Sequence, residues 1–328
     1  MTARGDPHPG RQDIKKTDGP HAQAMASEND PPHAHAFAYG GQAVIEGVMI
    51  RGEHAVSVAA RRPDGAIKTI SYPLPTWVTG RWRKIALVRG TLILLEAMVV
   101  GLRALTFSAQ VAAGEDNNEE PIPFWTIALT LLTSLGLAIG LFFVLPLIVT
   151  AGLVDRFVES SIVSNVAEGV IRLAIFFAYL GTISFMPTIR RVFAYHAAEH
   201  MTVHTLEANL PLEPSNVRLF PAAHPRCGTA FLLTVMVVSI LVFALLGTPD
   251  LPLRIASRIV FIPVIAGIAY EVIRFNGKHS GNWIVRMLSG PSLALQALTT
   301  RPPDDDQIEV AIVAMRTAID ADADHVAA

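Results

Sequence analysis

The sequence predicts a mainly α-helical membrane protein. We expect a polytopic helical bundle of about four spans, one interfacial or half-inserted amphipathic helix, and a small β-rich cytoplasmic segment near the N-terminus. Composition is the first reason, because 51% of the 328 residues are hydrophobic and only 16% are charged, whereas soluble domains carry about 25% charged residues. The second is a series of uncharged runs, each close to the roughly 20 apolar residues that cross a bilayer.

Both ends of the chain are predicted to lack stable structure. Residues 1–36 are polar, rich in Pro, His, Asp and Gly, and contain no apolar run typical of a secretory signal, so we expect a disordered tail. Near the other end, an apolar stripe predicts a cytoplasmic helix over residues 301–320 that docks on the rest of the domain. Residues 321–328 are expected to fray. The stripe consists of Ile308, Ile312, Met315 and Ile319.

Residues 37–76 are predicted to be β-rich. Val56–Ala60 and Ala66–Tyr72 flank the turn signal Arg-Pro-Asp-Gly at 62–65, which favours a hairpin. The preceding stretch, 40–52, contains four glycines among apolar residues and lacks the Gly-Lys-Ser/Thr of a phosphate loop. Its polar residues are either site residues or the charged edge of a small sheet. These residues are Gln42, Glu46 and Arg51.

Residues 77–300 are predicted to form the membrane domain. The chain from Pro121 to Val154 carries no charged residue, which is more than one bilayer crossing requires. Several such runs in one chain argue against buried helices of a soluble protein. The predicted spans are Phe124–Pro146, Leu173–Ile189, Gly228–Pro249 and Ile255–Ile273.

The segment Ile85–Gln110 is apolar enough to span but carries three charges. Arg89, Glu96 and Arg103 recur every seven residues and therefore share one helix face. A charged stripe facing lipid would be costly. We therefore expect this helix to lie in the membrane interface or to be half-inserted, with the stripe toward headgroups or packed against the other helices.

The distribution of Lys and Arg predicts the orientation in the membrane. Basic residues are frequent in 51–84, in 190–226 and after the fourth span, whereas the connection between the first two spans holds Arg156 and Arg172 beside three acidic residues. Because cytoplasmic loops carry the excess of Lys and Arg, we expect both termini and the 190–228 loop to be cytoplasmic. The predicted location is the inner (plasma) membrane.

A histidine–glutamate motif follows the second predicted span. His196 and His200 are four residues apart and share one face of a helix, with Glu199 beside them. This arrangement is typical of a divalent metal site with a carboxylate as ligand or general base. The chain from Thr188 to Ala208 contains no Gly or Pro and is predicted to form that helix. The same broad face carries His204 and Glu207.

A second cluster lies at the start of the third predicted span. It contains His224, Arg226 and Cys227, the only cysteine of the chain, which excludes an internal disulfide framework. Because a thiolate beside imidazoles suits zinc, zinc is the expected cofactor. The candidate ligands are His196, His200, His204, Glu207, His224 and Cys227.

The residues allow two kinds of chemistry. In the first, the two motif histidines with either His224 or Cys227 hold zinc, and Glu199 is the general base toward a water molecule. In the second, Cys227 is a nucleophile, a histidine is its base, and no metal is needed. Arg226 could hold an anionic group in either, and Glu207 is a further ligand or orients a histidine.

Two classes of function remain open, and one is excluded. The first is a metal-dependent enzyme, with hydrolysis favoured, and the second is a transporter subunit or assembly factor with a structural metal. Nucleic acid is not an expected partner, because the net charge of −2 provides no basic field. The expected partner is the lipid bilayer, and neither the substrate nor the oligomeric state follows from the sequence.

Several ordered motifs resemble one family. They are Gly-Gly-Gln-Ala-Val-Ile-Glu-Gly-Val-Met (40–49), His-x-x-Glu-His (196–200), His-Pro-Arg-Cys-Gly-Thr (224–229), Tyr-Glu-Val-Ile-Arg (270–274) and Leu-Thr-Thr (298–300). Together they resemble the YqhQ-like family of bacterial membrane proteins over roughly residues 39–319. The resemblance implies a membrane protein and a metal-dependent enzyme whose site contains His196, Glu199, His200, His224 and Cys227.

Overall fold

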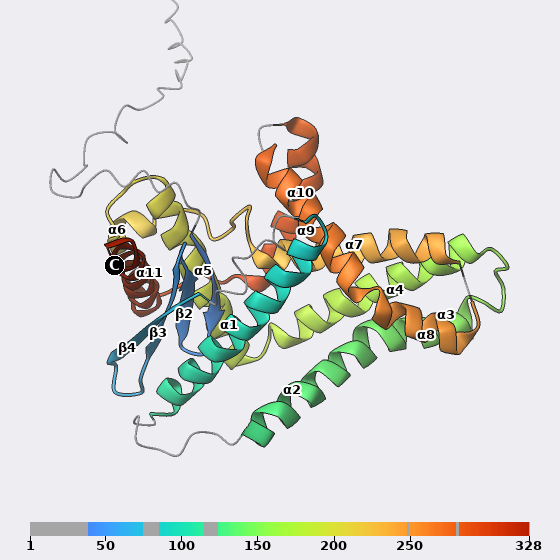
Figure 1. Cartoon of the computed structure of the whole chain (residues 1–328), viewed down its shortest axis with the longest axis horizontal. Coiled ribbons are helices and arrows are strands. Elements are labelled where there is room, and N and C mark those ends of the chain that lie inside the picture. The colour runs from blue at the N-terminus through green and yellow to red at the C-terminus, as the bar shows by residue number, and fades with distance from the viewer. Residues whose placement is uncertain (1–38, 75–84, 115–123, 248, 280–281, 328) are drawn as a thin grey trace, which may run out of the picture.

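A computed structural model describes residues 39–74, 85–114, 124–247, 249–279 and 282–327. The predicted disordered tail, residues 1–36, lies outside the described residues. Figure 1 shows two parts: a small sheet with helices on both faces, and a bundle of long helices beside it. The fold class is therefore mainly helical with a small antiparallel N-terminal sheet, as the sequence predicts.

The sheet is an antiparallel meander in the order β1-β2-β3-β4. The predicted turn connects the last two strands: Gly65 has φ +90° and donates its N–H to the Arg62 carbonyl at 3.0 Å. Gly47 is required for close packing, because a Cβ there would lie 2.2 Å from the Ala59 carbonyl oxygen. The strands are β1 (Gly40–Val44), β2 (Gly47–Arg51), β3 (Ala55–Arg61) and β4 (Ile67–Pro73).

Helices cover both faces of the sheet (Figure 1). On one face, α5 (Pro187–Glu207) and α11 (Asp305–Ala327) pack against a core that includes Val48 and Ile50. On the other face, α1 (Val88–Ala113) packs against a separate apolar cluster. The predicted helix at 301–320 thus docks on the sheet, and its apolar stripe lies in this core.

The C-terminus differs from the prediction of a frayed tail. Helix α11 continues through Ala327, because the buried carboxylate of Asp322 has four donors on the sheet. It accepts the Tyr39 hydroxyl at 2.9 Å and the backbone N–H groups of Glu53, His54 and Ala55 at 2.8–2.9 Å. In the sequence, the alternating aspartates of residues 320–324 resemble a solvent-exposed chain end.

The bundle is built from the helices that follow α1. Phe142 lies in a π-helical turn that joins α2 to α3 without interrupting the helix. A short helix, α6 (Pro214–Val217), lies in the loop that connects α5 to α7. The bundle elements are α2 (Phe124–Ile139), η4 (Gly140–Val144), α3 (Leu145–Leu153), α4 (Ser161–Ile183), α7 (Gly228–Leu246), α8 (Leu251–Val260), α9 (Ile262–Lys278) and α10 (Trp283–Thr299).

Within the described residues, four helices are long and apolar enough to cross a membrane, and the pair α8–α9, bent by 46°, would add a fifth if it crosses as one. Three predicted spans therefore have counterparts in α2–α3, α4 and α7. The fourth, 255–273, is not one straight helix but contains the bend. Val88–Ala113 is instead the fourth candidate. The other three are Ala128–Leu153, Ser161–Ile183 and Gly228–Leu246.

The predicted boundaries of the second span are also wrong. The helix begins at Ser161 rather than Leu173, and it ends at Ile183 before Pro187 starts α5. Glu168 and Arg172, which the sequence suggested as part of a connection, lie inside the helix and are buried. Charged residues are tolerated there only because other helices supply partners for them.

An ionic cluster around Glu168 supplies those partners. Oε1 of Glu168 accepts from Arg172 Nη2 (2.6 Å) and Arg258 Nε (3.1 Å). Oε2 accepts from Arg258 Nη2 (2.8 Å) and Arg254 Nη2 (3.1 Å). Arg254 also pairs with Asp155 at 2.8 Å, and the Arg172 Nε donates to the Phe142 carbonyl of the π-helical turn at 2.9 Å. One carboxylate therefore ties α8 to α4.

The charged stripe of α1 is packed against protein. Arg89 pairs with Glu271 of α9 (Nε–Oε1, 2.6 Å), and Glu96 pairs with Arg51 of β2 at 2.9 Å. The Arg103 guanidinium lies 3.9 Å from the centre of the Tyr72 ring. The predicted packing against other helices holds for Arg89, whereas Glu96 and Arg103 contact the sheet instead. The outward face of α1 is apolar and exposed, and it includes Leu94, Leu95, Met98, Val99 and Leu105.

We predict that Glu168→Gln strongly destabilises the protein. The change leaves three buried arginines without their shared carboxylate, and breaking a buried ion pair typically costs about 3–5 kcal/mol. Thermal unfolding of the purified protein in detergent should show a clearly lower melting temperature. The exposed Glu159→Gln is the matched control, and equal melting temperatures of the two variants would contradict the assigned role of the cluster.

Candidate metal centre

Helix α5 presents the histidine motif, and its ends follow from local sequence. Pro187 occupies the first turn, where its missing N–H costs nothing. After Ala208 the chain turns at Asn209, which has φ +53°. The observed helix, Pro187–Glu207, therefore differs from the predicted one by one residue at each end. The loop that follows returns over the histidine face and reaches Cys227, the N-cap of α7.

Three predicted ligands meet at this junction. One ligand atom each from His196, His200 and Cys227 lies within 4.8 Å of the other two. The His196 Nε2 is 3.2 Å from the Cys227 sulfur, and the rings of the two histidines have centroids 4.3 Å apart. The sulfur is held in place by Thr229, whose backbone N–H lies 3.4 Å away. These groups come from α5 and from the start of α7.

Backbone carbonyls determine which nitrogen of each histidine is free. The His196 Nδ1 lies 2.9 Å from the Thr299 carbonyl, and the His200 Nδ1 lies 2.6 Å from the Ala222 carbonyl. Because a carbonyl only accepts, each Nδ1 carries a hydrogen, and a neutral imidazole in this orientation has its lone pair on Nε2. This orientation, with Nδ1–H on a carbonyl, is what metal-binding histidines in proteins adopt. The donor set therefore fits a cation such as zinc.

Glu199 lies beside this group on the sheet side of α5. Its Oε2 is 3.6 Å from the His200 Nε2, and the side chain is buried. Burial raises the pKa of Glu199 to about 7, against the opposing effects of His196 and of the Gly41 backbone N–H. A carboxylate oxygen and an imidazole lone pair that face each other need a proton or a cation between them.

The other predicted ligands form a second group. Ligand atoms of His204, Glu207 and His224 also lie within 4.8 Å of one another. However, the His224 Nδ1 accepts the Arg226 backbone N–H at 3.2 Å, so Nε2 carries the hydrogen. Among the described residues, that buried Nε2 has no hydrogen-bond partner, and it lies 3.6 Å from Glu207 Oε1. A nitrogen that carries a hydrogen offers no lone pair to a cation, which makes this group a weaker cation site than the first.

Burial and neighbouring imidazoles keep His224 neutral. Burial, followed by the proximity of His204 and His200, lowers the pKa of His224 to about 3. The His204 Nε2 lies 3.0 Å from the Ala223 carbonyl, which it donates to. The guanidinium of Arg226 pairs with Glu207. Arg226, predicted to hold an anionic group, therefore already has a carboxylate partner.

Two residues of α10 support the site but were not predicted. The buried Gln296 amide donates to the His224 carbonyl at 2.9 Å and accepts the His224 N–H at 2.8 Å. Thr299 supplies the carbonyl that orients His196. The one available signal was a glutamine inside an otherwise apolar helical segment, because a backbone carbonyl leaves no trace in sequence.

The glycine-rich stretch 40–52 acts mainly as a structural connection. Glu46 pairs with Arg191 of α5 (Nε–Oε1, 2.6 Å) and accepts the Tyr195 hydroxyl at 3.3 Å. Arg51 pairs with Glu96, and Gln42 lies against Gly101 of α1. The charged-edge interpretation of these residues therefore agrees with the structure. Glu46 holds the sheet against α5, the helix that carries the histidines, whereas Arg51 and Gln42 contact α1 on the other face.

Comparison with known proteins identifies the family. The model of the family described as "Protein of unknown function (DUF1385)" matches residues 85–321. The chain belongs to this family. It is also 34% identical over 299 residues to the uncharacterized protein YqhQ of Bacillus subtilis (strain 168), which covers 88% of this chain and 92% of that protein. No solved structure matches the chain.

The hydrogen-bond pattern predicts different zinc contents for two histidine variants. The purified protein should contain about one zinc per chain. His196→Ala should lose it, because a ligand is removed, whereas His204→Ala should retain it. Elemental analysis of detergent-purified protein measures this, with the exposed His279→Ala as control.

Zinc loss in His204→Ala with zinc retention in His196→Ala would reassign the cation to the second group. Full zinc retention in both His196→Ala and His200→Ala would contradict the first group as the metal centre. Thermal unfolding of each variant separates loss of the ligand from loss of the fold.

Proposed function

We propose that this protein is an integral membrane, zinc-dependent enzyme, a hydrolase with its site at the cytoplasmic face of the inner membrane. One observation carries the proposal. The Nε2 lone pairs of His196 and His200 converge with the Cys227 sulfur, and backbone carbonyls hold both imidazoles in the metal-binding orientation.

The donor set supports zinc and an open position. Two imidazoles and one thiolate are a soft set of ligands, which favours zinc over magnesium or manganese. Three protein ligands are the number found in catalytic zinc sites, where the fourth position remains available. When bound, zinc supplies a Lewis acid that lowers the pKa of a water molecule.

Glu199 is the proposed general base. It is buried beside the His200 Nε2 but is not one of the three converging ligands. Its pKa, raised to about 7 by burial, suits a group that accepts and returns a proton near neutral pH. The N–H of Gly41 from β1 donates to the carboxylate, so the sheet fixes its position. Glu199 therefore has the location and proton affinity that hydrolysis requires.

A metal-free alternative uses the same atoms. The Cys227 sulfur lies 3.2 Å from the His196 Nε2, within reach for proton transfer from a nucleophilic thiol. The carbonyl of Thr299 would orient this base from its other nitrogen. However, the lone pair of His200 and the carboxylate of Glu199 have no role in that scheme. The zinc proposal uses all four groups.

The fold supports the sidedness. The sheet, α5 and α11 pack together and therefore lie on one side of the membrane. An even number of crossings must separate each of these elements from the next. Crossings by α2–α3 and α4 before α5, and by α7 and α8–α9 after it, satisfy this rule, whereas an additional crossing by α1 does not. We therefore assign α1 to the interface and both termini to the cytoplasm.

Burial favours a second candidate function. His200 and Glu199 are only 2% and 3% exposed, as is common for a structural metal rather than a reactive one. Together with the buried ionic cluster of α4 and α8, this would suit a transporter subunit or assembly factor.

The variant Glu199→Gln distinguishes the two functions. If the carboxylate is the base, the variant should keep its zinc and lose about 10²–10⁴-fold in hydrolysis. The measurement uses 4-nitrophenyl esters and phosphodiesters as probes, alongside rescue of a strain that lacks the protein. The control is the exposed Glu213→Gln in the neighbouring loop.

Full cellular activity of Glu199→Gln with normal zinc content would refute the enzyme proposal. It would support the structural role of the metal, because a structural site needs the ligands but not the carboxylate.

A further inference from the structure

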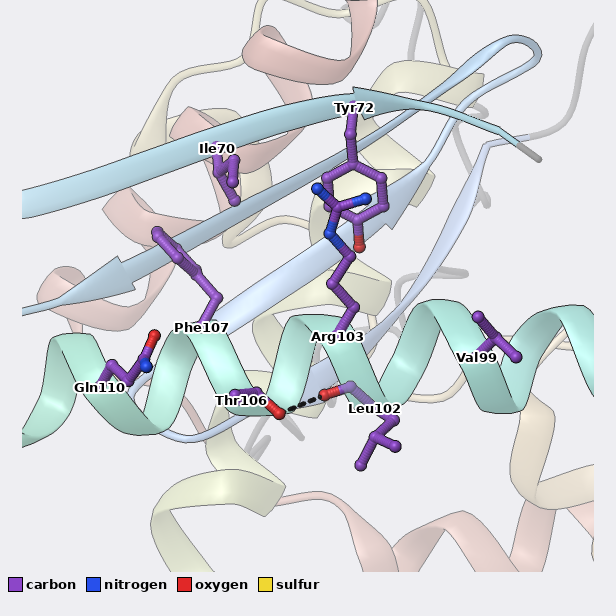
Figure 2. Close-up of a pocket in the computed structure, with 8 residues that line it drawn as sticks. All are labelled: Ile70, Tyr72, Val99, Leu102, Arg103, Thr106, Phe107 and Gln110. Atoms are coloured by element: carbon purple, nitrogen blue, oxygen red, sulfur yellow. Dashed lines mark hydrogen bonds between the residues drawn. The ribbon is translucent and has the colours of Figure 1, made fainter. Parts of the chain in front are cut away.

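A groove lies far from the metal centre, where α1 meets the edge strand β4. It has a volume of about 410 Å³, which is within the range of ligand sites. Figure 2 shows Ile70 and Tyr72 on the strand facing Arg103 and Phe107 of α1, whereas Leu102 and Thr106 lie along the edge of the helix away from the strand. The α1 residues are Val99, Leu102, Arg103, Thr106, Phe107 and Gln110.

The walls of the groove are mostly hydrocarbon. Ile70, Val99, Leu102 and Phe107 supply apolar side chains from both elements. Thr106 does not offer its hydroxyl to a ligand, because it donates to the Leu102 carbonyl at 2.9 Å within the helix. The groove therefore suits an alkyl chain better than a polar metabolite.

Arg103 gives this apolar groove a positive charge. Its guanidinium lies over the Tyr72 ring at 3.9 Å (Figure 2) and is exposed. Within the described part of the chain, no carboxylate lies within 4.0 Å of it. The other two charges of the same helix stripe, Arg89 and Glu96, both have ionic partners. Stacking on a ring leaves guanidinium N–H groups available to an anion.

The groove is continuous with the apolar face of α1. Val99 lines the groove and is 49% exposed, beside the exposed Met98 and Leu95 of the outward face. An apolar helix face of this size on one side and charged groups on the other are typical of a helix at a membrane interface. The sequence between β4 and α1 adds tryptophan and basic residues, as interfacial anchors do. They are Trp77, Arg81, Trp82, Arg83 and Lys84.

We infer that this groove binds one anionic phospholipid. An acyl chain lies between β4 and α1 along Ile70 and Phe107, and the phosphate accepts hydrogen bonds from Arg103. The lipid fixes the sheet to the membrane surface. The inference depends on membrane association of α1 and not on the metal chemistry. Zinc content therefore tests the proposed enzyme, and lipid retention tests the groove.

Native mass spectrometry of the full chain tests the inference. The detergent-purified protein is titrated with phosphatidylglycerol or phosphatidylcholine. We expect one phosphatidylglycerol retained per chain, and a preference over phosphatidylcholine that Arg103→Gln lowers about fivefold, the equivalent of about 1 kcal/mol per basic residue at an anionic surface. The control Arg190→Gln removes another exposed arginine and should keep the preference.

A second variant tests the apolar part of the groove. Thr106→Trp adds a large side chain at the rim of the groove, which Thr106 lines, and should abolish retention of either lipid. Met98→Trp places the same side chain on the outward face of α1, outside the groove, and should leave retention unchanged. Both variants should keep the zinc content and melting temperature of the parent protein.

Three results would overturn the inference. They are equal retention of both lipids by the parent protein, an unchanged preference in Arg103→Gln, and unchanged retention in Thr106→Trp. A parent protein that retains lipid but contains no zinc would contradict the proposed enzyme and leave the lipid site intact.

Discussion

Buried polar groups must find partners, and this constraint determines the architecture of the molecule. Glu168 lies among three arginines in the bundle, which allows α4 to begin well before the apolar run that the sequence displays. Asp322 collects donors from the sheet and extends α11 to its last turn. In apolar surroundings an unpaired charge costs more than most single contacts contribute. Each of these carboxylates therefore fixes the position of a whole helix.

The candidate metal centre follows the same rule in a different form. Its imidazole Nδ1 atoms are satisfied by carbonyls from the 211–226 loop and from α10, whereas its Nε2 atoms, a thiol and a carboxylate face one another. The ligand atoms of the two histidines and the cysteine lie within 4.8 Å of one another, which favours a cation there, and Glu199 lies beside His200. The second histidine group has fewer lone pairs free for a cation, because Glu207 is already paired with Arg226 and lies near the His224 Nε2.

The site lies at the seam between the two parts of the molecule. The sheet holds α5 through Glu46 and positions Glu199 through Gly41, while α7 and α10 of the bundle contribute Cys227 and Thr299. Movement of the bundle relative to the sheet would therefore change the donor set directly. A lipid at the opposite face of the sheet, beside α1, would restrict that movement from the membrane side.

The sequence by itself determined the features that depend on local patterns. Hydropathy gave the helical bundle, the Arg-Pro-Asp-Gly signal gave the hairpin, and residue spacing placed His196, His200 and His204 on one helix of nearly the observed length. Only the tertiary structure decided the start of α4, the ordered C-terminus and the division of the histidines into two groups. These depend on contacts between residues distant in the chain, such as His196 with Thr299 and Arg258 with Glu168. A backbone carbonyl or a compensating charge on another helix leaves no periodic signal in the sequence.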